Sequence, residues 1–287
     1  MSEPAGLAGG FSRIRIDLAY DGTDFSGWAK QPGLRTVQGE LLLALEQIFG
    51  PSDKDFGIRV AGRTDAGVHA DHQVCHIDLD PQQLGRLGRS DLTPARLNGL
   101  LPEDVRVLGV SVAPEGFDAR FSATGRGYRF LIADSNCKPD PKRSRFALEQ
   151  PSELNLDLMQ DAAKGLTGLK DFGAFCKPRP EATTIRELRK LELKRLSDGV
   201  IEVVLEADAF CHNMVRAIVG SLIAVGSGKL SASELWEIQV AAKRVSKFKV
   251  VDPKGLSLSE IRYPEDPKLA EQAKKARNRR GIEEISV

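Results

Sequence analysis

The chain has 287 residues, with 41 lysines and arginines against 40 aspartates and glutamates, and 41% of its residues are hydrophobic. This length suits two packed halves, and the apolar fraction excludes an intrinsically disordered protein. The net charge of +1 excludes a uniformly basic nucleic-acid coat, although like charges can still gather on one face.

The sequence has no segment typical of a membrane or secreted protein. No apolar run approaches the roughly 20 residues that a membrane span requires. The first residues lack a basic stretch followed by an apolar one, so we expect no signal peptide and a flexible tail over residues 1–12. The four cysteines form no CxxC pair, and a chain of this length needs no disulfides, which favours a reducing, cytoplasmic compartment.

The first half of the chain mixes strand and helix patterns. Residues 13–20 alternate polar and apolar side chains, which predicts a strand with one buried face. Thr36 can cap a helix over 37–49, with Glu40 beside the positive end of its dipole. Weaker patterns predict strands at 57–61, 73–79 and 105–112 and a short helix at 91–101. This order is typical of an α+β fold.

The second half repeats this style. Its predicted strands lie at 128–133, 188–196, 200–207 and 255–263, and its predicted helices at 156–166, 212–225 and 233–244. The tripeptide Ser197-Asp198-Gly199 predicts a hairpin turn between two of these strands. The proline-rich stretch 134–151 predicts a surface loop.

The most informative segment is AGRTDAGVHA, at 61–70. Gly62 and Gly67 bracket Asp65, and glycines permit a tight turn and the close approach of another molecule. This pattern would hold one carboxylate at the tip of a turn between two strands. An ordinary turn is the alternative, because Thr-Asp-Ala-Gly is also common loop chemistry.

A second unusual segment runs from 209 to 226, where Arg216 is the only formally charged residue. Most of this helix must be buried, and a buried guanidinium without an anion or acceptors costs several kcal/mol. Its partner is either a structural carboxylate or a catalytic one such as Asp65. An arginine would keep that acid ionised, as a nucleophile requires.

The third segment, GFDARFSATGRGYR at 116–129, interleaves basic and aromatic residues. Guanidinium groups bind phosphates, and flat rings stack on exposed bases. Alternation along a strand would place Arg126 and Tyr128 on one face. The alternative is a strand with solvated arginines and a core tyrosine.

From about residue 13 to residue 264, the sequence resembles the tRNA pseudouridine synthase A family. The motifs that carry the resemblance appear in family order: RIDLAYDGTDFSGWAKQPGLRTVQGEL, AGRTDAGVHA, FDARFSATGRGYRF, KDFGAF, HNMVRAIVGSL and KGLSLSEIRYP. This family isomerises uridine to pseudouridine in the anticodon stem-loop of tRNA, at nucleotides 38 to 40. The resemblance implies an isomerase with tRNA as its partner and no cofactor.

The resemblance also implies the pseudouridine synthase fold, an α+β architecture of two pseudo-symmetric halves around a central cleft. Each half would carry an antiparallel sheet with helices, like an RNA-recognition or ferredoxin-type module. We expect the half with the Asp65 loop over 13–113, the other half over 114–264, and a charged tail over 265–287. The family implies a homodimer in which one tRNA touches both subunits, and no membrane partner.

Catalytic roles follow from the resemblance residue by residue. Asp65 falls on the nucleophile, and Arg216 falls on the arginine paired with it. Arg63 falls on the arginine that helps to displace the target base from the stack. Tyr128 falls on the tyrosine that packs on the flipped uracil and is a candidate relay for the proton of C5.

Binding roles follow in the same way. Leu256 or Leu258 falls near the apolar wall of the uracil pocket. The remaining residues are expected to contact RNA: Arg120, Phe117, Phe121 and Arg126.

Other functions fit parts of the sequence. An RNA-binding module without catalysis would explain the basic and aromatic segment, but not the glycine-bracketed acid or the isolated Arg216. A pseudouridine synthase that acts on a different RNA is a further alternative. A carbohydrate hydrolase would need a second acid near Asp65, and none lies at an informative position.

A metal site is the other alternative. His69, His72 and His76, with Cys75, have spacings that could suggest one. A structural zinc site needs four convergent ligands, so we favour histidines on different faces and predict no metal.

The segment after Tyr263 is rich in charges of both signs. Its cations would allow nonspecific contact with RNA: Lys274, Lys275, Arg277, Arg279 and Arg280. Acidic residues in the same region nearly cancel them, and salt screens exposed charges, so the pattern favours a solvated tail.

Overall fold

The structure is a computed structural model that describes residues 10–88, 90–179, 183–278 and 281–285. The expected N-terminal tail lies outside the described residues up to residue 9. By its internal contacts the chain divides into two compact units. The first comprises Met1–Thr124 and Leu258–Arg277, and the second comprises Gly125–Ser257 and Asn278–Val287.

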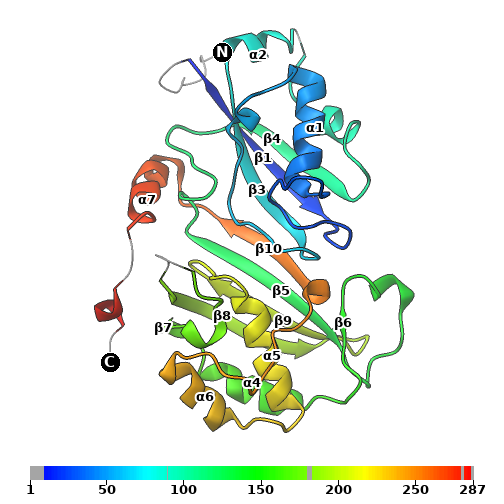
Figure 1. The fold of residues 1–287 in the computed structure, drawn as a ribbon, viewed down its shortest axis with the longest axis vertical. Helices are drawn as coiled ribbons and strands as arrows, with labels where there is room; N and C mark the ends of the chain where they lie inside the picture. The colour runs from blue at the N-terminus through cyan, green and yellow to red at the C-terminus, as the bar shows by residue number, and fades with distance from the viewer. Residues whose placement is uncertain (1–9, 89, 180–182, 279–280, 286–287) are drawn as a thin grey trace. The chain divides into compact units, whose positions relative to one another are not determined.

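The first unit is built on an antiparallel sheet with strand order β4–β1–β3, and β10 follows β3 (Figure 1). Its strands are β1 (Ser12–Tyr20), β2 (Arg59–Val60), β3 (His69–Leu79), β4 (Val105–Val112) and, from Leu258 onward, β10 (Leu256–Arg262), with β2 paired to β3. The alternation predicted at 13–20 is confirmed, because Ile16 and Leu18 are fully buried between half-buried neighbours. One face of β1 therefore belongs to the core of this unit.

Short helices accompany this sheet: α1 (Val37–Phe49), α2 (Pro81–Gly85), α3 (Pro94–Asn98) and α7 (Leu269–Lys275). The limits predicted for α1 are confirmed. The hydroxyl of Thr36 accepts the N–H of Gly39 at 3.2 Å, and Gly50 ends the helix with a φ of +74°. Helix α2 was not predicted, because five residues show no apolar period.

The second unit has a sheet with strand order β5–β9–β8–β7, in which all of these neighbours are antiparallel. Its strands are β5 (Gly125–Ala133), β6 (Leu148–Glu149), β7 (Gly168–Asp171), β8 (Ile185–Arg195) and β9 (Ile201–Ala207). The predicted hairpin turn is confirmed, because Gly199 has a φ of +91° and donates its N–H to Leu196. The predicted loop 134–151 contains the strand β6, which pairs in parallel with β5, and this corrects the prediction. A strand of two residues is too short to show a pattern in the sequence.

The described residues of the second unit also form the helices α4 (Leu156–Lys164), α5 (Met214–Gly226) and α6 (Ala232–Ala241). They pack against one another, and α4 also packs against β8. In α5 every residue except Arg216 is buried, as the sequence predicts. Helix α6 begins with a capping box between Ser231 and Glu234. Helices packed on antiparallel strands, together with the parallel pair β5–β6, confirm the predicted α+β class.

The cysteines differ from the sequence-based expectation. Cys176 and Cys211 form a disulfide with their Cα atoms 5.7 Å apart, whereas Cys75 and Cys137 are free thiols. The two cysteines are 35 residues apart in the sequence, and a separation of this length does not indicate that they form a disulfide. Among the helices of the described residues, none combines the length and apolar character needed to cross a bilayer.

Candidate active site

The loop over 61–68 connects β2 to β3 in the first unit. The N–H of Ala61 donates to the carbonyl of Val74 at 2.8 Å, which continues the pairing of the two strands into the loop. Gly67 has a φ of +75°, and the N–H of Val68 closes a turn on the carbonyl of Asp65 at 3.2 Å. The turn predicted around Asp65 is therefore present, with the Asp65 side chain half-buried and Arg63 exposed.

The two bracketing glycines have different roles. Gly67 adopts a backbone conformation that other residues rarely take. Gly62 has no positive φ, and a Cβ added there would meet no atom within 4 Å. Only Gly67 is therefore required by the turn itself.

A neighbouring loop, residues 21–36, holds the backbone on both sides of Asp65. The N–H of Trp28 donates to the carbonyl of Thr64 at 3.1 Å, and the N–H of Gly67 donates to the carbonyl of Phe25 at 3.2 Å. Gly27 makes this approach possible, because a Cβ there would lie 2.8 Å from the Thr64 oxygen. The rings of Trp28 and Phe25 are buried, so the backbone groups that make these hydrogen bonds belong to tightly packed residues.

Two buried polar side chains support the same loop. The amide of Gln73, which is fully buried, donates to the carbonyl of Gly62 at 2.7 Å and to the hydroxyl of Tyr20 at 3.3 Å. The Tyr20 hydroxyl in turn lies 2.7 Å from the hydroxyl of Thr64. A buried donor without a hydrogen-bond acceptor is costly in free energy. This series of hydrogen bonds therefore fixes Thr64, the residue before Asp65.

Tyr20 and Gln73 are not among the site residues predicted from the sequence. A signal was present, because Gln73 shares the strand face of Cys75 and Ile77, both fully buried. A polar amide on an apolar face needs a partner, and that need indicates a supporting role.

The segment over 116–124 forms a second structured turn in the first unit. The carboxylate of Asp118 accepts the N–H groups of Arg120 and Phe121, both at 2.9 Å. The hydroxyl of Ser122 accepts the N–H of Asp118 at 2.9 Å and so closes the turn. Arg120 is exposed and Phe121 is half-buried at its tip.

Asp118 is almost fully buried and ionised. Burial tends to raise the pKa of its carboxyl, but the N–H of Phe121 and the charge of Arg59 hold that pKa below its ordinary value. Arg59, the first residue of β2, donates a hydrogen bond of 2.8 Å to the carboxylate of Asp118. The segment is thus tied to the strand that leads into the Asp65 loop.

Aromatic packing anchors the base of the segment. The ring of Phe117 is 1% exposed and packs against His76 and Tyr263, at ring-centroid distances of 6.1 and 5.1 Å. His76 accepts the N–H of Ala119 at 3.0 Å, and Tyr263 donates its hydroxyl to the carbonyl of Ala119 at 2.7 Å. Phe117 thus packs in the interior of this unit instead of presenting its ring to RNA.

His76 is held in its neutral form. Burial, together with the positive charge of Arg13, lowers the pKa of His76 to about 4. A neutral imidazole is what the contact requires, because Nδ1 must accept the Ala119 N–H.

The second unit carries the predicted base-binding tyrosine. Tyr128 lies on β5, half-buried, with its ring edge-on to Phe210 at 5.0 Å. Arg126, two residues earlier on the same strand, donates to the carbonyl of Asp208 at 2.9 Å. Both side chains are half-buried while Gly127 between them is buried, which fits the expected shared face. Sequence analysis missed Phe210 as a support for Tyr128.

Arg216 is half-buried on α5, and its Nε donates to the carbonyl of Val251 at 2.7 Å. A backbone carbonyl of the second unit thus accepts one of the hydrogen bonds that the Arg216 guanidinium can donate. Asp65 belongs to the first unit, and the expected pairing of Asp65 with Arg216 stays a prediction.

The remaining expected residues lie on β10. Leu256 and Leu258 are buried, at 5% and 0% exposure. The hydroxyl of Ser257 between them is buried without a hydrogen-bond partner among the described residues.

The histidines near the Asp65 loop each have a protein partner. His69 accepts the N–H of Gly22 at 3.0 Å, and His72 lies 2.8 Å from Asp17. Over the part of the chain that the structure describes, no group of three or more His, Cys, Asp or Glu side chains is placed to hold a metal ion.

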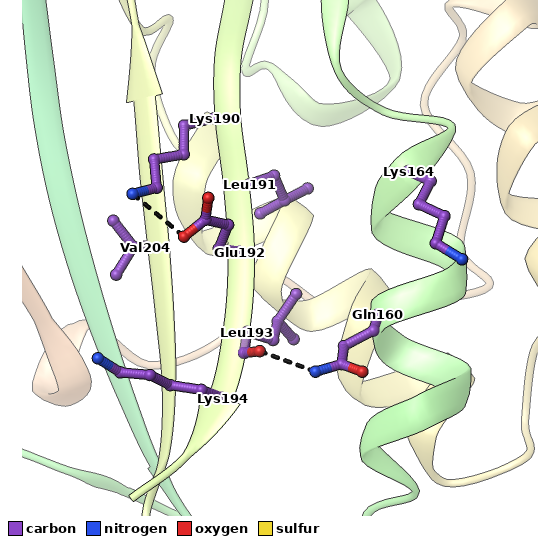
Figure 2. Close-up of a pocket in the computed structure, with 8 residues that line it drawn as sticks. All are labelled: Gln160, Lys164, Lys190, Leu191, Glu192, Leu193, Lys194 and Val204. Carbon is purple, nitrogen blue, oxygen red and sulfur yellow. Dashed lines mark hydrogen bonds and ion pairs between the residues drawn. The ribbon is translucent and has the colours of Figure 1, made fainter.

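A groove of about 490 Å³ lies between α4 and β8 of the second unit (Figure 2). Its lining residues are Gln160, Lys164, Lys190, Leu191, Glu192, Leu193, Lys194 and Val204. The three lysines pair with acids, for example Lys190 with Glu192 at 3.1 Å. The groove includes none of the predicted site residues.

Known proteins of similar sequence identify the family. A family model described as tRNA pseudouridine synthase matches residues 162–264. The tRNA pseudouridine synthase A of Leifsonia xyli subsp. xyli is 45% identical, over 94% of this chain and 98% of its own length. That of Streptomyces avermitilis is 47% identical over 95% of each chain. The chain belongs to the tRNA pseudouridine synthase A family.

Membership of the tRNA pseudouridine synthase A family confirms the resemblance drawn from the sequence motifs. The Mycobacterium leprae member is 43% identical over 91% of this chain. Among solved structures, an archaeal box H/ACA Nop10–Cbf5 complex aligns over 74% of this chain with 9% identity and a TM-score of 0.30, too low to support an argument.

Proposed function

We propose that this protein isomerises uridine to pseudouridine at nucleotides 38 to 40 of the anticodon stem-loop of tRNA. As a tRNA pseudouridine synthase it is an isomerase, and full-length similarity to the family supports that reaction class. The observation that carries the proposal is the Asp65 loop, in which packed neighbours hold both flanks of a half-buried carboxylate.

The reaction needs a group that can attack and leave again. The N1–C1′ bond of uridine breaks, the base turns, and C5 joins C1′; a proton leaves C5 and N1 gains one. We assign Asp65 as the nucleophile, because a carboxylate can bond to an electrophilic sugar carbon and then depart. Its fixed backbone supports this role, since catalysis requires the attacking group to be positioned before the substrate arrives.

The target base must leave the helix before it can react. Unstacking and unpairing cost a few kcal/mol, which the protein must offset. Arg63, exposed beside Asp65, would occupy the vacated space. Tyr128, braced by Phe210, would stack on the extruded ring and take part in removing the C5 proton.

The remaining assignments complete the proposed site. Arg216 would pair with Asp65 and keep it ionised. Leu256 and Leu258 would form the apolar wall of the uracil pocket. Arg120, Phe121 and Arg126 would contact the RNA, with Phe117 supporting the segment from below.

We further propose that the protein acts as a homodimer in the cytoplasm, with one tRNA touching both subunits. The tRNA substrate and the family support both statements. Sedimentation of the protein with and without tRNA would test the dimer directly.

The proposed function is tested with Asp65→Asn, which keeps size and shape but removes the charge. We expect the variant to fold, to bind tRNA and to form no pseudouridine, measured by a chemical label specific for that nucleoside. Asp53→Asn, an exposed acid in the same unit, is the matched control and should retain wild-type activity.

The same assay separates the other functions. Normal turnover by Asp65→Asn would refute the nucleophile assignment. A wild-type protein that binds tRNA but labels no nucleotide would be an RNA-binding module. Labelling of another structured RNA, with none in tRNA, would assign a different substrate.

A further inference from the structure

The segment over 265–277 is folded against the segment over 116–124, which corrects the interpretation of a solvated tail for these residues. Leu269 and Ala273 are 2% and 5% exposed. The hydroxyl of Ser122 donates to the carbonyl of Leu269 at 3.1 Å, and a Cβ at Gly116 would lie 2.7 Å from the Cβ of Ala270. The sequence did not predict this packing, because two apolar residues four positions apart, surrounded by charged residues, form too short an apolar stripe.

This docking brings Arg277 to the tip of the segment. Its guanidinium carbon lies 4.8 Å from the ring centroid of Phe121, and its Nη2 lies 3.8 Å from Asp118. The guanidinium carbons of Arg59 and Arg120 lie 5.9 and 5.1 Å from the same ring centroid. We call these three residues the arginine cluster; they come from β2, from the segment itself and from the residues after α7.

Two members of the cluster, Arg59 and Arg277, carry a surplus of positive charge. Both contact Asp118, which supplies one negative charge against their two positive ones. The Asp118 side chain is 8% exposed, whereas those of Arg59 and Arg277 are 48% and 52% exposed. The carboxylate therefore orders the cluster from beneath, and the guanidinium groups face solvent.

Guanidinium groups in this arrangement suit phosphate. Each is planar, permanently charged and able to donate two parallel hydrogen bonds to one phosphate group. All three lie around a single ring, so neighbouring phosphates of one strand can meet more than one of them. A half-buried ring flanked by cations is also typical of surfaces that bind nucleic acid.

The position of the cluster places it near the proposed reaction. Arg59 precedes Asp65 by six residues, and that length of chain spans at most roughly 20 Å. A stem-loop whose target nucleotide reaches Asp65 would therefore carry phosphates within reach of the cluster.

We infer that Arg59, Arg120 and Arg277 form one phosphate-binding site for the RNA backbone, completed by the C-terminal segment. The inference rests on the proposed function, because it takes RNA as the ligand. It makes Arg277 an RNA-binding residue, held at the cluster by the docking of Leu269 and Ala273.

The test compares Arg277→Ala with Lys275→Ala, which removes the same charge from an exposed position two residues earlier. We expect Arg277→Ala to weaken binding of unmodified tRNA about 5- to 10-fold near 0.1 M salt and to reduce the slope of log K against log salt by about 1. Lys275→Ala should leave both nearly unchanged. Arg277→Lys keeps the charge but not the planar fork, so it should fall between wild type and Arg277→Ala.

Further measurements make the inference falsifiable. In the isomerisation assay, the effect of Arg277→Ala should lie mainly in KM, and its unfolding temperature should match that of Arg277→Lys. Equal affinities and salt slopes for Arg277→Ala and Lys275→Ala would overturn the inference. So would a loss of polyglutamate binding in Arg277→Ala with no loss of tRNA affinity, which would assign the cluster to an acidic peptide.

Failure of this inference is distinguishable from failure of the proposed function. If Arg277→Ala binds normally while Asp65→Asn is inactive, the phosphate site is wrong and the reaction stands. If Asp65→Asn remains active, the catalytic assignment is wrong, whatever the binding data show.

Discussion

The loop over 61–68 and the segment over 116–124 both present polar side chains from irregular backbone, but they are held differently. The first depends on partners outside the loop, the hydroxyl of Tyr20 and the amide of Gln73. The second carries its own hydrogen-bond acceptors, Asp118 and Ser122, and then packs on aromatic rings. One is fixed by tertiary structure and the other largely by local turn chemistry.

This difference matches the roles that we propose for the two regions. A nucleophile must be positioned within a fraction of an ångström, and a rigid surrounding core can provide that. A backbone-binding surface tolerates small movements, because charge attraction acts over several ångströms. We therefore expect damage to the support of the loop to reduce catalysis, and damage to the support of the segment to reduce affinity.

The largest effect is expected from Gly27→Ala, matched by Gly33→Ala in the same loop. Both glycines have positive φ, so both variants carry backbone strain of about 1 kcal/mol. Only at position 27 does the new methyl collide with the carbonyl of Thr64. We expect Gly27→Ala to lose about 3 kcal/mol of unfolding free energy and most of its kcat. Equal losses in the two variants, by thermal melting and turnover, would show that the contact with Thr64 does not matter.

The sequence predicted those parts of the fold that local signals determine. Helix α1 was predicted from its Thr36 cap and apolar stripe, and the β8–β9 turn from Ser197-Asp198-Gly199. The sequence did not predict β7, because its four residues obtain their strand form by pairing with β8. Short elements of this kind depend on a neighbour that no window of sequence contains.

The candidate site divides in the same way. The turn at Asp65 was predicted because Gly67 imposes it locally. The support by Tyr20 was not, because its partner Thr64 lies 44 residues away and the ring itself fits a core pattern. The docking of Leu269 was hidden by the charges around it. Local chemistry thus predicted the turn at Asp65, and tertiary contacts determine how that turn is held.

A pH effect separates the two regions further, through His76 beneath the segment. Its pKa falls from 6.5 to about 4 in the folded protein, mainly by burial and then by Arg13, with Asp78 and Asp118 opposing. Well above pH 6.5 the imidazole is neutral in both states. As the pH drops from 6.5 towards 4, the unfolded chain binds a proton that the folded chain does not, so unfolding free energy is lost.

We expect the protonation of His76 in the unfolded chain to lower the free energy of unfolding by about 2 kcal/mol at pH 5 relative to pH 7. His76→Asn retains an acceptor for the Ala119 N–H without this titration, so its loss over the same range should be smaller. Denaturant unfolding at several pH values measures the difference. Parallel pH profiles for wild type and variant would mean that another group is responsible.

The smallest and most specific effect is expected from two hydroxyl deletions, Tyr20→Phe and Tyr263→Phe. The first removes the group between Thr64 and Gln73, and the second removes the donor to Ala119 at the base of the segment. Each should cost about 1 kcal/mol of unfolding free energy, since Tyr263→Phe loses one hydrogen bond, and Tyr20→Phe loses one at 2.7 Å and a longer one at 3.3 Å. Their kinetics should differ: Tyr20→Phe lowers kcat with little change in KM, and Tyr263→Phe raises KM with little change in kcat. If both variants changed the same constant, the two regions would not have separate roles in positioning and binding, because loss of either support would then disturb the same step.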